Sequence, residues 1–325
     1  MKLSIPYLIL LAVSGAIAYW STIQKANITG ESENQVQVWD GGSKDLNSLN
    51  YKSLETVIEI NRKTYEGKRF YWGKIKKQKE TSEFEFLLSN RFEEYLSKFH
   101  PLTATRVFKN IDDAKLKEFG FEKLPRSILD LSYDNGETLN LEIGSKGFGG
   151  EFSYVREKNQ RAVWLLPQDI YDDLESLDAR FFEKNFMEAA VEDIKSFEFL
   201  VKNTSKKILH SGKDPDGTVG WQTVETAGNT ANPGFKNWFD RFARLRVVAY
   251  PSFSEYDKIK ASFIEKILVL LIDSGLEKNQ KLEFFSSKEN QDFVYVISNL
   301  KPVIYRVSKA KIQPLVDEYQ KILAF

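Results

Sequence analysis

The folded part of this sequence is written twice, and the two copies lie about 140 residues apart. Each copy has the same order of patterns: an alternating strand, a strand with a tryptophan, a helix with one apolar stripe, and two hairpins before a terminal helix. Matches in this order predict a duplicated domain. The matched segments, first copy before second, are 54–60 and 194–200, Trp72 and Trp221, 92–99 and 235–242, 128–136 and 267–275, and 152–164 and 293–305.

The duplication predicts the fold class and the domain limits. Each copy indicates a mostly antiparallel sheet with helices packed on one face, because hairpin signals join its strands and its helices are apolar along one stripe. We therefore expect an α+β protein with two tandem related domains, the first over residues 51–180 and the second over residues 181–325. The length of 325 residues agrees with two domains, because a single hydrophobic core stops growing at about 250–300 residues.

The N-terminus carries an apolar segment of the length that a membrane helix needs. Residues 3–20 contain no charge, and a helix of that length, at 1.5 Å per residue, spans about 27 Å. Lys2 favours a cytoplasmic N-terminus. We expect residues 1–24 to be a transmembrane anchor of the inner (cytoplasmic) membrane, residues 25–50 to be a tether, and the body to lie on the periplasmic or extracytoplasmic side. The alternative is a cleaved signal peptide, because residues 16–18 resemble a cleavage site.

Composition excludes several classes of function. Lys plus Arg and Asp plus Glu both number 46, so a net charge of zero gives no general attraction to a nucleic-acid backbone. The absence of cysteine removes disulfides, thiolate metal sites and cysteine nucleophiles. Only His100 and His210 remain as imidazole groups for acid–base or metal chemistry. We therefore expect no nucleic-acid partner, no cofactor and no metal site.

Two short motifs resemble ligand loops but lack the required context. The glycine-rich run 144–150 is followed by a strand pattern, whereas a phosphate loop leads into a helix, so we interpret it as a connection between strands. Asp214, Asp216 and Glu225 fit positions 1, 3 and 12 of a calcium loop, but Val219 stands where that loop needs glycine. We interpret this segment as a turn.

The remaining candidates for catalysis are isolated. His100 follows a predicted helix and His210 lies at a strand end, and neither has the aligned partners of a catalytic triad. The adjacent carboxylates at 93–94 and at 172–173 point to different faces of their helices, so we interpret them as solvated charge. We expect no catalytic residue.

The helix predicted over 235–242 is the one candidate for a partner interface. Trp238 lies on its aromatic stripe, and Arg241, Arg244 and Arg246 lie beside that stripe. One interpretation is a core stripe with a basic solvent edge; the other is an interface patch, because Trp and Arg dominate binding hot spots. The corresponding helix at 92–99 is acidic instead, which suggests different partners for the two copies or one partner that spans both.

Three segments carry a family resemblance. Residues 118–144, the strand pair at 152–170 and the junction 177–186 resemble the bacterial family of domains of unknown function numbered 4340, over roughly residues 50–320. The resemblance implies an N-terminal anchor, an extracytoplasmic body and a link, by gene neighbourhood, to ABC-type transporters of the gliding-motility class. It attaches no catalytic residues. Arg180 matches a recurrent arginine of the family, whereas the apolar residues that follow it depart from the family's more charged pattern.

These observations favour a non-catalytic, membrane-anchored accessory or adaptor protein of an ABC-type transport complex. Its expected partners are the membrane, which it crosses once, and a permease and ATPase complex or another envelope protein. The transport assignment follows from the resemblance alone. Two alternatives stay open: a hydrolase of envelope polymers, which needs paired carboxylates in a cleft, and a passive structural protein of the envelope.

Overall fold

The computed structural model groups the chain into two compact units. Its described residues are 36–39, 45–65, 67–122, 124–147, 149–167, 169–201, 204–213, 219–223, 233–275, 279–288 and 290–323. Unit 1 comprises the described residues up to Asn61 together with 75–83 and 90–180, and unit 2 comprises 62–74, 84–89 and the described residues from Phe181 on. None of the helices in these ranges is long and apolar enough to cross a membrane. The predicted anchor at 1–24 lies outside the described residues.

The first sheet has nine strands in the order β5-β4-β3-β2-β8-β9-β10-β11-β7. Every described pairing in it is antiparallel. A separate antiparallel pair joins β1 (Val36–Trp39) to β6 (Leu102–Ala104). The strands are β2 (Leu46–Ser53), β3 (Thr56–Tyr65), β4 (Lys68–Lys77), β5 (Glu83–Leu87), β7 (Arg106–Phe108), β8 (Ser127–Tyr133), β9 (Thr138–Lys146), β10 (Phe152–Glu157) and β11 (Val163–Pro167).

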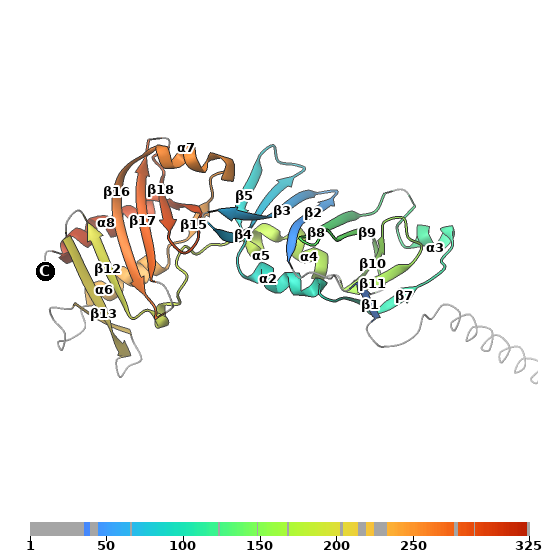
Figure 1. Cartoon of the computed structure of the whole chain (residues 1–325), viewed down its shortest axis with the longest axis horizontal. Helices are drawn as coiled ribbons and strands as arrows, with labels where there is room; N and C mark the ends of the chain where they lie inside the picture. The colour runs from blue at the N-terminus through green and yellow to red at the C-terminus, as the bar shows by residue number, and fades with distance from the viewer. Residues whose placement is uncertain are drawn as a thin grey trace, which may run out of the picture. The chain divides into compact units, whose positions relative to one another are not determined.

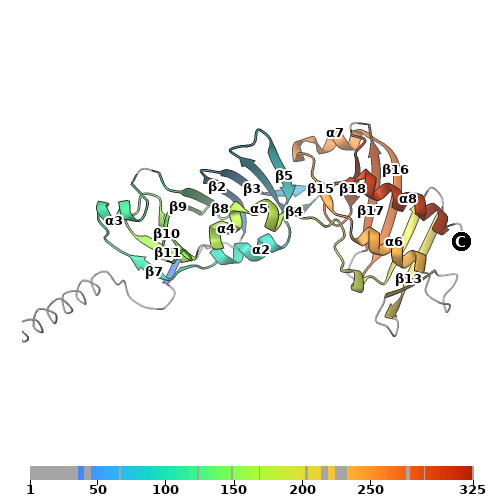
Figure 2. The same ribbon diagram turned by 180° about the vertical axis from the view of Figure 1, so that it is seen from behind.

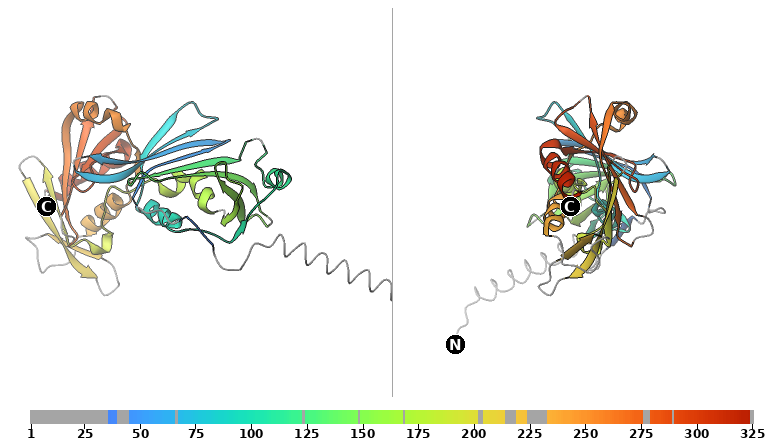
Figure 3. Two further views of the ribbon diagram at one scale, coloured as in Figure 1. Left: turned by 45° about the vertical axis from the view of Figure 1, so that its right-hand side comes forward. Right: turned by 90° about the vertical axis from the view of Figure 1, so that its left-hand side faces the viewer.

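The core of unit 1 lies between this sheet and its helices. Residues of β8 alternate between buried and half-buried, so that one face of the strand is fully covered. Leu131 on that face pairs with Leu49 of β2 and with Leu139 of β9. In Figure 1 and the left view of Figure 3, α2, α4 and α5 lie on one side of β2 and β8. The helices are α2 (Arg91–Leu96), the 3-10 turn η1 (Ser97–Phe99), α3 (Asp113–Glu118), α4 (Asp169–Glu175) and α5 (Leu177–Phe181).

The second sheet has eight strands in the order β14-β13-β12-β16-β17-β18-β19-β15, again with antiparallel pairings. The strands are β12 (Ser196–Val201), β13 (Thr204–Lys213), β14 (Val219–Thr223), β15 (Val247–Ala249), β16 (Phe263–Asp273), β17 (Gln280–Ser287), β18 (Phe293–Ser298) and β19 (Ile304–Ser308). The helices of unit 2 are η2 (Val191–Asp193), α6 (Pro233–Ala243), η4 (Phe253–Glu255), α7 (Tyr256–Ala261) and α8 (Lys309–Leu323). The prediction of an α+β fold with mostly antiparallel sheets is confirmed.

An aromatic core holds α6 and α8 against the second sheet. Figure 2 shows both helices on the same face of the sheet. Phe197 of β12 stacks on Phe239 of α6 at 5.1 Å between ring centroids. Phe199 of the same strand stacks on Tyr319 of α8 at 4.6 Å. The aromatic stripe predicted over 235–242 therefore faces the sheet.

The two sheets follow the same strand order once β5 is set aside. β4-β3-β2-β8-β9-β10-β11-β7 corresponds, position by position, to β14-β13-β12-β16-β17-β18-β19-β15. Trp72 in β4 and Trp221 in β14 occupy the same position in these orders. The sequence match of 54–60 with 194–200 is wrong by one strand, because it equates β3 with β12, whereas β2 holds the position of β12. β2 itself begins at Leu46, inside the segment that was expected to be a tether.

Candidate functional site

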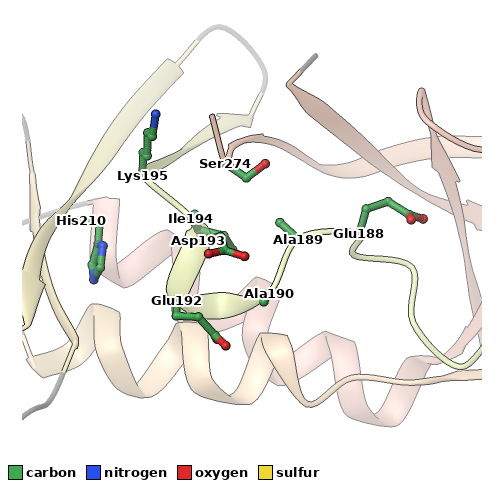
Figure 4. Close-up of a pocket in the computed structure, with 9 residues that line it drawn as sticks. All are labelled: Glu188, Ala189, Ala190, Glu192, Asp193, Ile194, Lys195, His210 and Ser274. Carbon is green, nitrogen blue, oxygen red and sulfur yellow. The ribbon is translucent and has the colours of Figure 1, made fainter. Parts of the chain in front are cut away.

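A depression in unit 2 has the size of a ligand site. Its volume is about 600 Å³, within the range of roughly 300–1,000 Å³ that small-molecule sites occupy. It lies where the chain passes from η2 into β12 (Figure 4). The lining residues are Glu188, Ala189, Ala190, Glu192, Asp193, Ile194, Lys195, His210 and Ser274.

A buried glutamine fixes the chain at one side of the depression. Gln280, which is 3% exposed, donates from Nε2 to the carbonyl oxygen of Phe186 at 2.7 Å and to Ser298 Oγ at 3.1 Å. Its Oε1 accepts from the backbone N–H of Glu188 at 3.0 Å. The amide is therefore satisfied on both sides, as a buried amide must be. Sequence reasoning missed Gln280. The one feature of the sequence that could have indicated it is a polar residue at a position of an alternating strand that should face the core.

One carboxylate of the depression, Glu188, is paired within unit 2. Lys301 Nζ lies 3.0 Å from Glu188 Oε1 and 3.4 Å from Glu183 Oε2. The other charged groups point in different directions: Figure 4 shows Lys195 directed away from Glu192, with Glu188 at the opposite side from His210. These side chains do not converge on one point, as the acid, base and nucleophile of a reaction centre would.

His210 packs against the core of unit 2. Its backbone N–H donates to the carbonyl oxygen of Lys195 at 2.8 Å, and its ring packs on Trp221 at 5.1 Å. Nε2 has no hydrogen-bond partner among the described residues. Burial lowers the pKa of His210 from its ordinary value of 6.5, so the ring is neutral near pH 7.

The two motifs that resembled ligand loops have different outcomes. β9 ends at Lys146 and β10 begins at Phe152, so the glycine-rich run 144–150 connects two strands, as expected. Asp214 and Asp216 lie outside the described residues, as does Glu225. Within the described part of the chain, no three His, Asp or Glu side chains are grouped so that they could hold a metal ion.

Trp238 is a core residue and not a surface residue. Its side chain is 0% exposed, and its Nε1 donates to the carbonyl oxygen of Leu315 in α8 at 2.8 Å. It stacks on Phe242 of the same helix with ring centroids 5.2 Å apart. Its place in the predicted interface is therefore wrong, because a side chain covered by α8 and the sheet cannot reach a partner.

The three arginines beside Trp238 form an exposed edge, although two of them also have internal partners. Arg241 pairs with Glu318 of α8 and donates from Nε to the carbonyl oxygen of Asn237 at 3.2 Å. Arg246 donates to the carbonyl oxygens of residues 243 and 245 at 2.8 and 2.9 Å, which satisfies the C-terminal end of α6. Arg244 is exposed. The basic edge is Arg241, Arg244 and Arg246.

One of the carboxylates expected to be solvated is buried. Asp173 of α4 is 7% exposed, with Lys98 Nζ at 3.0 Å and Arg180 Nη1 at 2.6 Å. The prediction of solvated charge is wrong here, because two cations from other elements replace the water. It is confirmed for Glu93 and Glu94, which are exposed on α2. The arginine that matched the family pattern thus has a structural role in unit 1.

Comparison with known proteins identifies one family. A family model described as a domain of unknown function (DUF4340) matches residues 89–267, more than half of the chain. This match confirms the resemblance carried by 118–144 and 152–170. No curated protein and no solved structure matches the chain.

Proposed function

The chain belongs to the DUF4340 family, and on this basis we propose that it is a non-catalytic, membrane-anchored adaptor of an ABC-type transport complex. The body works outside the cytoplasm and binds a permease and ATPase assembly. The assignment to transport follows what the family resemblance implies. The adaptor role is supported by the surface chemistry of the two units.

The observation that carries the proposal is the basic edge of α6. Arg241 stands on α6, whose opposite face is packed against the core, and Arg244 and Arg246 follow the end of that helix on either side of the buried Leu245. Arginine suits interface ion pairs because it is planar, permanently charged and weakly hydrated. The helix α2 of unit 1 exposes Glu93 and Glu94 instead. Two charged faces of opposite sign favour contacts with different partners, or with one partner that spans both.

We further infer that the two sheets descend from one duplicated domain. The support is the shared order of eight strands together with the ordered sequence matches. Chance alternation explains a single matched strand more readily than eight strands in one order. A duplicated module with different surface charges suits an adaptor, because the two copies keep one fold and change only their partners.

The anchor completes the proposal. Residues 3–20 are uncharged and have the length of a membrane-spanning helix. They hold the body at the outer face of the cytoplasmic membrane. Because the anchor and a permease share one membrane, the effective concentration of the body at the extracytoplasmic surface of the permease is raised.

Affinity purification of the full chain from detergent-solubilised membranes tests this function. We expect one permease and one ATPase polypeptide to elute with it in fixed proportion, as measured by quantitative mass spectrometry. The control is residues 1–44 with the same tag, which keeps the anchor and ends before β2 (Leu46–Ser53), the first strand of the nine-stranded sheet. Elution of the full chain without these subunits, together with turnover of an envelope polymer by the purified protein, would instead identify a hydrolase.

A further inference from the structure

Two segments of unit 2 come from the first half of the sequence. Residues 62–74 and 84–89 belong to this unit, although they are parts of β3, β4 and β5. We call these two segments the hairpin arm. Its contacts with the rest of unit 2 are aromatic, polar and backbone-mediated.

Trp72 is the apolar centre of the hairpin arm. It is 4% exposed and lies among three rings of unit 2. The centroid of Trp72 is 5.6 Å from that of Tyr250, 5.8 Å from that of Phe253 and 6.0 Å from that of Tyr256. The two tyrosines meet the indole edge to face, the geometry that aromatic quadrupoles prefer.

Glu85 supplies the directional contacts. Its Oε2 accepts from Trp72 Nε1 at 2.8 Å and from the backbone N–H of Phe253 at 3.2 Å. Its Oε1 accepts from Ser252 Oγ at 3.0 Å. One carboxylate thus joins the indole of the arm to residues 252 and 253, and hydrogen bonds to a charged acceptor are stronger than neutral ones.

Two lysines fix the sides of the arm. Lys68 Nζ, next to the β3–β4 turn, donates to the carbonyl oxygen of Leu300 at 2.8 Å and also to that of Asn299. Lys260 of α7 donates to Tyr65 Oη at 2.9 Å and lies 5.0 Å from the centre of the same ring. These contacts set the register of the arm.

Backbone hydrogen bonds join residues 181–183 to residues 87–89 of the hairpin arm. The N–H of Ser89 donates to the carbonyl oxygen of Phe181 at 2.8 Å, and the N–H of Glu183 donates to the carbonyl oxygen of Leu87 at 3.0 Å. Phe182 stacks on Phe84 with ring planes 14° apart. Residues 181–183 therefore add to the arm as a short strand does in β-augmentation.

From these contacts we propose that unit 2 contains a hairpin-binding site made of residues 181–183, 250–256 and 299–300, with the hairpin arm as its covalently attached ligand. The site recognises three consecutive strands with a lysine at the first turn, a tryptophan on the second strand and a glutamate on the third. Trp221 holds the same strand position in the second sheet, but it packs on Phe239 of α6 at 4.8 Å. Trp221 is therefore held against α6 and not at this site.

Hydrogen exchange of the full-length chain tests the site. Glu85→Gln keeps the shape of the side chain and weakens three hydrogen bonds. We expect amide exchange at 250–256 and 181–183 to become about tenfold faster, while 268–272 and 282–284 in the sheet keep their rates. Trp164→Ala, a tryptophan change on β11 of unit 1, is the matched control and leaves 250–256 unchanged.

Rescue by an added ligand gives the second readout. In full-length Trp72→Ala, an excess of a synthetic peptide of residues 56–90 restores slow exchange at 250–256, whereas the same peptide with Trp72→Ala does not. An even acceleration over all of unit 2 in Glu85→Gln would overturn the proposal, because the arm would then be an inseparable part of the core. Unchanged exchange in that variant, or no rescue by the peptide, would overturn it as well.

Discussion

Gly144 and Gly120 bring two segments of unit 1 into backbone contact. A Cβ on Gly144 would overlap the carbonyl oxygen of Phe119, and one on Gly120 would lie 2.6 Å from the backbone nitrogen of Ser145. Between them, the N–H of Ser145 donates to the carbonyl oxygen of Phe119 at 2.8 Å. Both glycines lie in the segment that carries the family resemblance, and this close approach is the physical reason for them.

Gly144→Ala should therefore destabilise unit 1. We expect the free energy of unfolding to fall by at least about 2 kcal/mol, because the backbone of 119 must move to admit the methyl group. Urea unfolding measures the change. Gly136→Ala is the control, because Gly136 has a φ of 84° and no atom lies within 4 Å of a new Cβ. We expect this variant to lose about 1 kcal/mol of unfolding free energy, since alanine is strained in a left-handed conformation. Equal losses in the two variants would contradict a steric role for Gly144.

The pKa of His210 makes stability depend on pH. Burial lowers this pKa below 6.5 in the folded chain, so the unfolded chain binds the proton first as pH falls, and stability is lost between the unfolded and the folded pKa. His210→Phe keeps a ring against Trp221 and removes the proton site. We expect its free energy of unfolding to fall less than that of the parent chain between about pH 7 and pH 5. Parallel pH curves for the two chains would show that another group titrates.

Sequence reasoning placed His210 at a strand end, which is wrong, because His210 lies inside β13 (Thr204–Lys213). Its ring meets Trp221 because the two residues are directly opposite each other in the antiparallel pair of β13 and β14. The alternation of one strand does not show which residue of the neighbouring strand lies opposite. The aromatic stripe of α6 was predictable, since helical spacing alone places Phe235, Trp238, Phe239 and Phe242 on one face.

At the scale of elements, the sequence patterns predicted six strands in each copy, whereas the sheets have nine and eight, and β2 is one of the strands that escaped prediction. β2 pairs with β8 through a bulge between Leu46 and Ser48, so its buried residues Leu46 and Leu49 are three positions apart. The bulge breaks the period of two on which strand prediction relies. The sequence match therefore paired β3, instead of β2, with β12 of the second sheet. The matches of the helices and the hairpins agree with the element order beside the two sheets, because helical spacing and turn residues are local signals.

The acidic helix α4 is expected to depend on its cationic partners. Asp173→Ala leaves Lys98 and Arg180 without their shared carboxylate, and we expect a loss of about 2 kcal/mol. This is less than for a fully buried pair, because Arg180 keeps access to water. Thermal or urea unfolding checks it, with Glu94→Ala on the exposed face of α2 as the control, expected within about 0.5 kcal/mol. A loss no larger than that of the control would show that water replaces the pair.

At the scale of the whole molecule, sequence order and spatial grouping diverge. Residues 62–74 and 84–89 are continuous with the first copy in sequence, whereas their packing assigns them to unit 2. Composition and periodicity report which residues are buried but not against which segment. The arm was therefore beyond sequence reasoning, although Trp72 itself was singled out.

The proposed anchor gives a prediction for the intact protein. If residues 3–20 are retained, the mature chain keeps Met1 or Lys2 and stays in the membrane pellet after a carbonate wash, because a mostly apolar span of 18 residues is released only by detergent. Intact-mass spectrometry and fractionation of the native protein check this. A mature N-terminus at Tyr19 would identify a cleaved signal peptide.

The central claim is that the basic edge of α6 binds the transport complex. Its most direct test is the co-purification of full-length Arg241→Glu/Arg244→Glu, compared with the parent chain and with Arg106→Glu/Arg161→Glu. The control reverses the same charge on unit 1, where Arg161 holds an exposed ion pair as Arg241 does.

We expect the α6 variant to lose the permease and ATPase subunits while its Tm stays within a few degrees, because an exposed ion pair contributes less than about 1 kcal/mol. The control variant should keep both subunits. Undiminished co-purification of a folded α6 variant, or a loss of subunits equal to that of the control, would contradict the account.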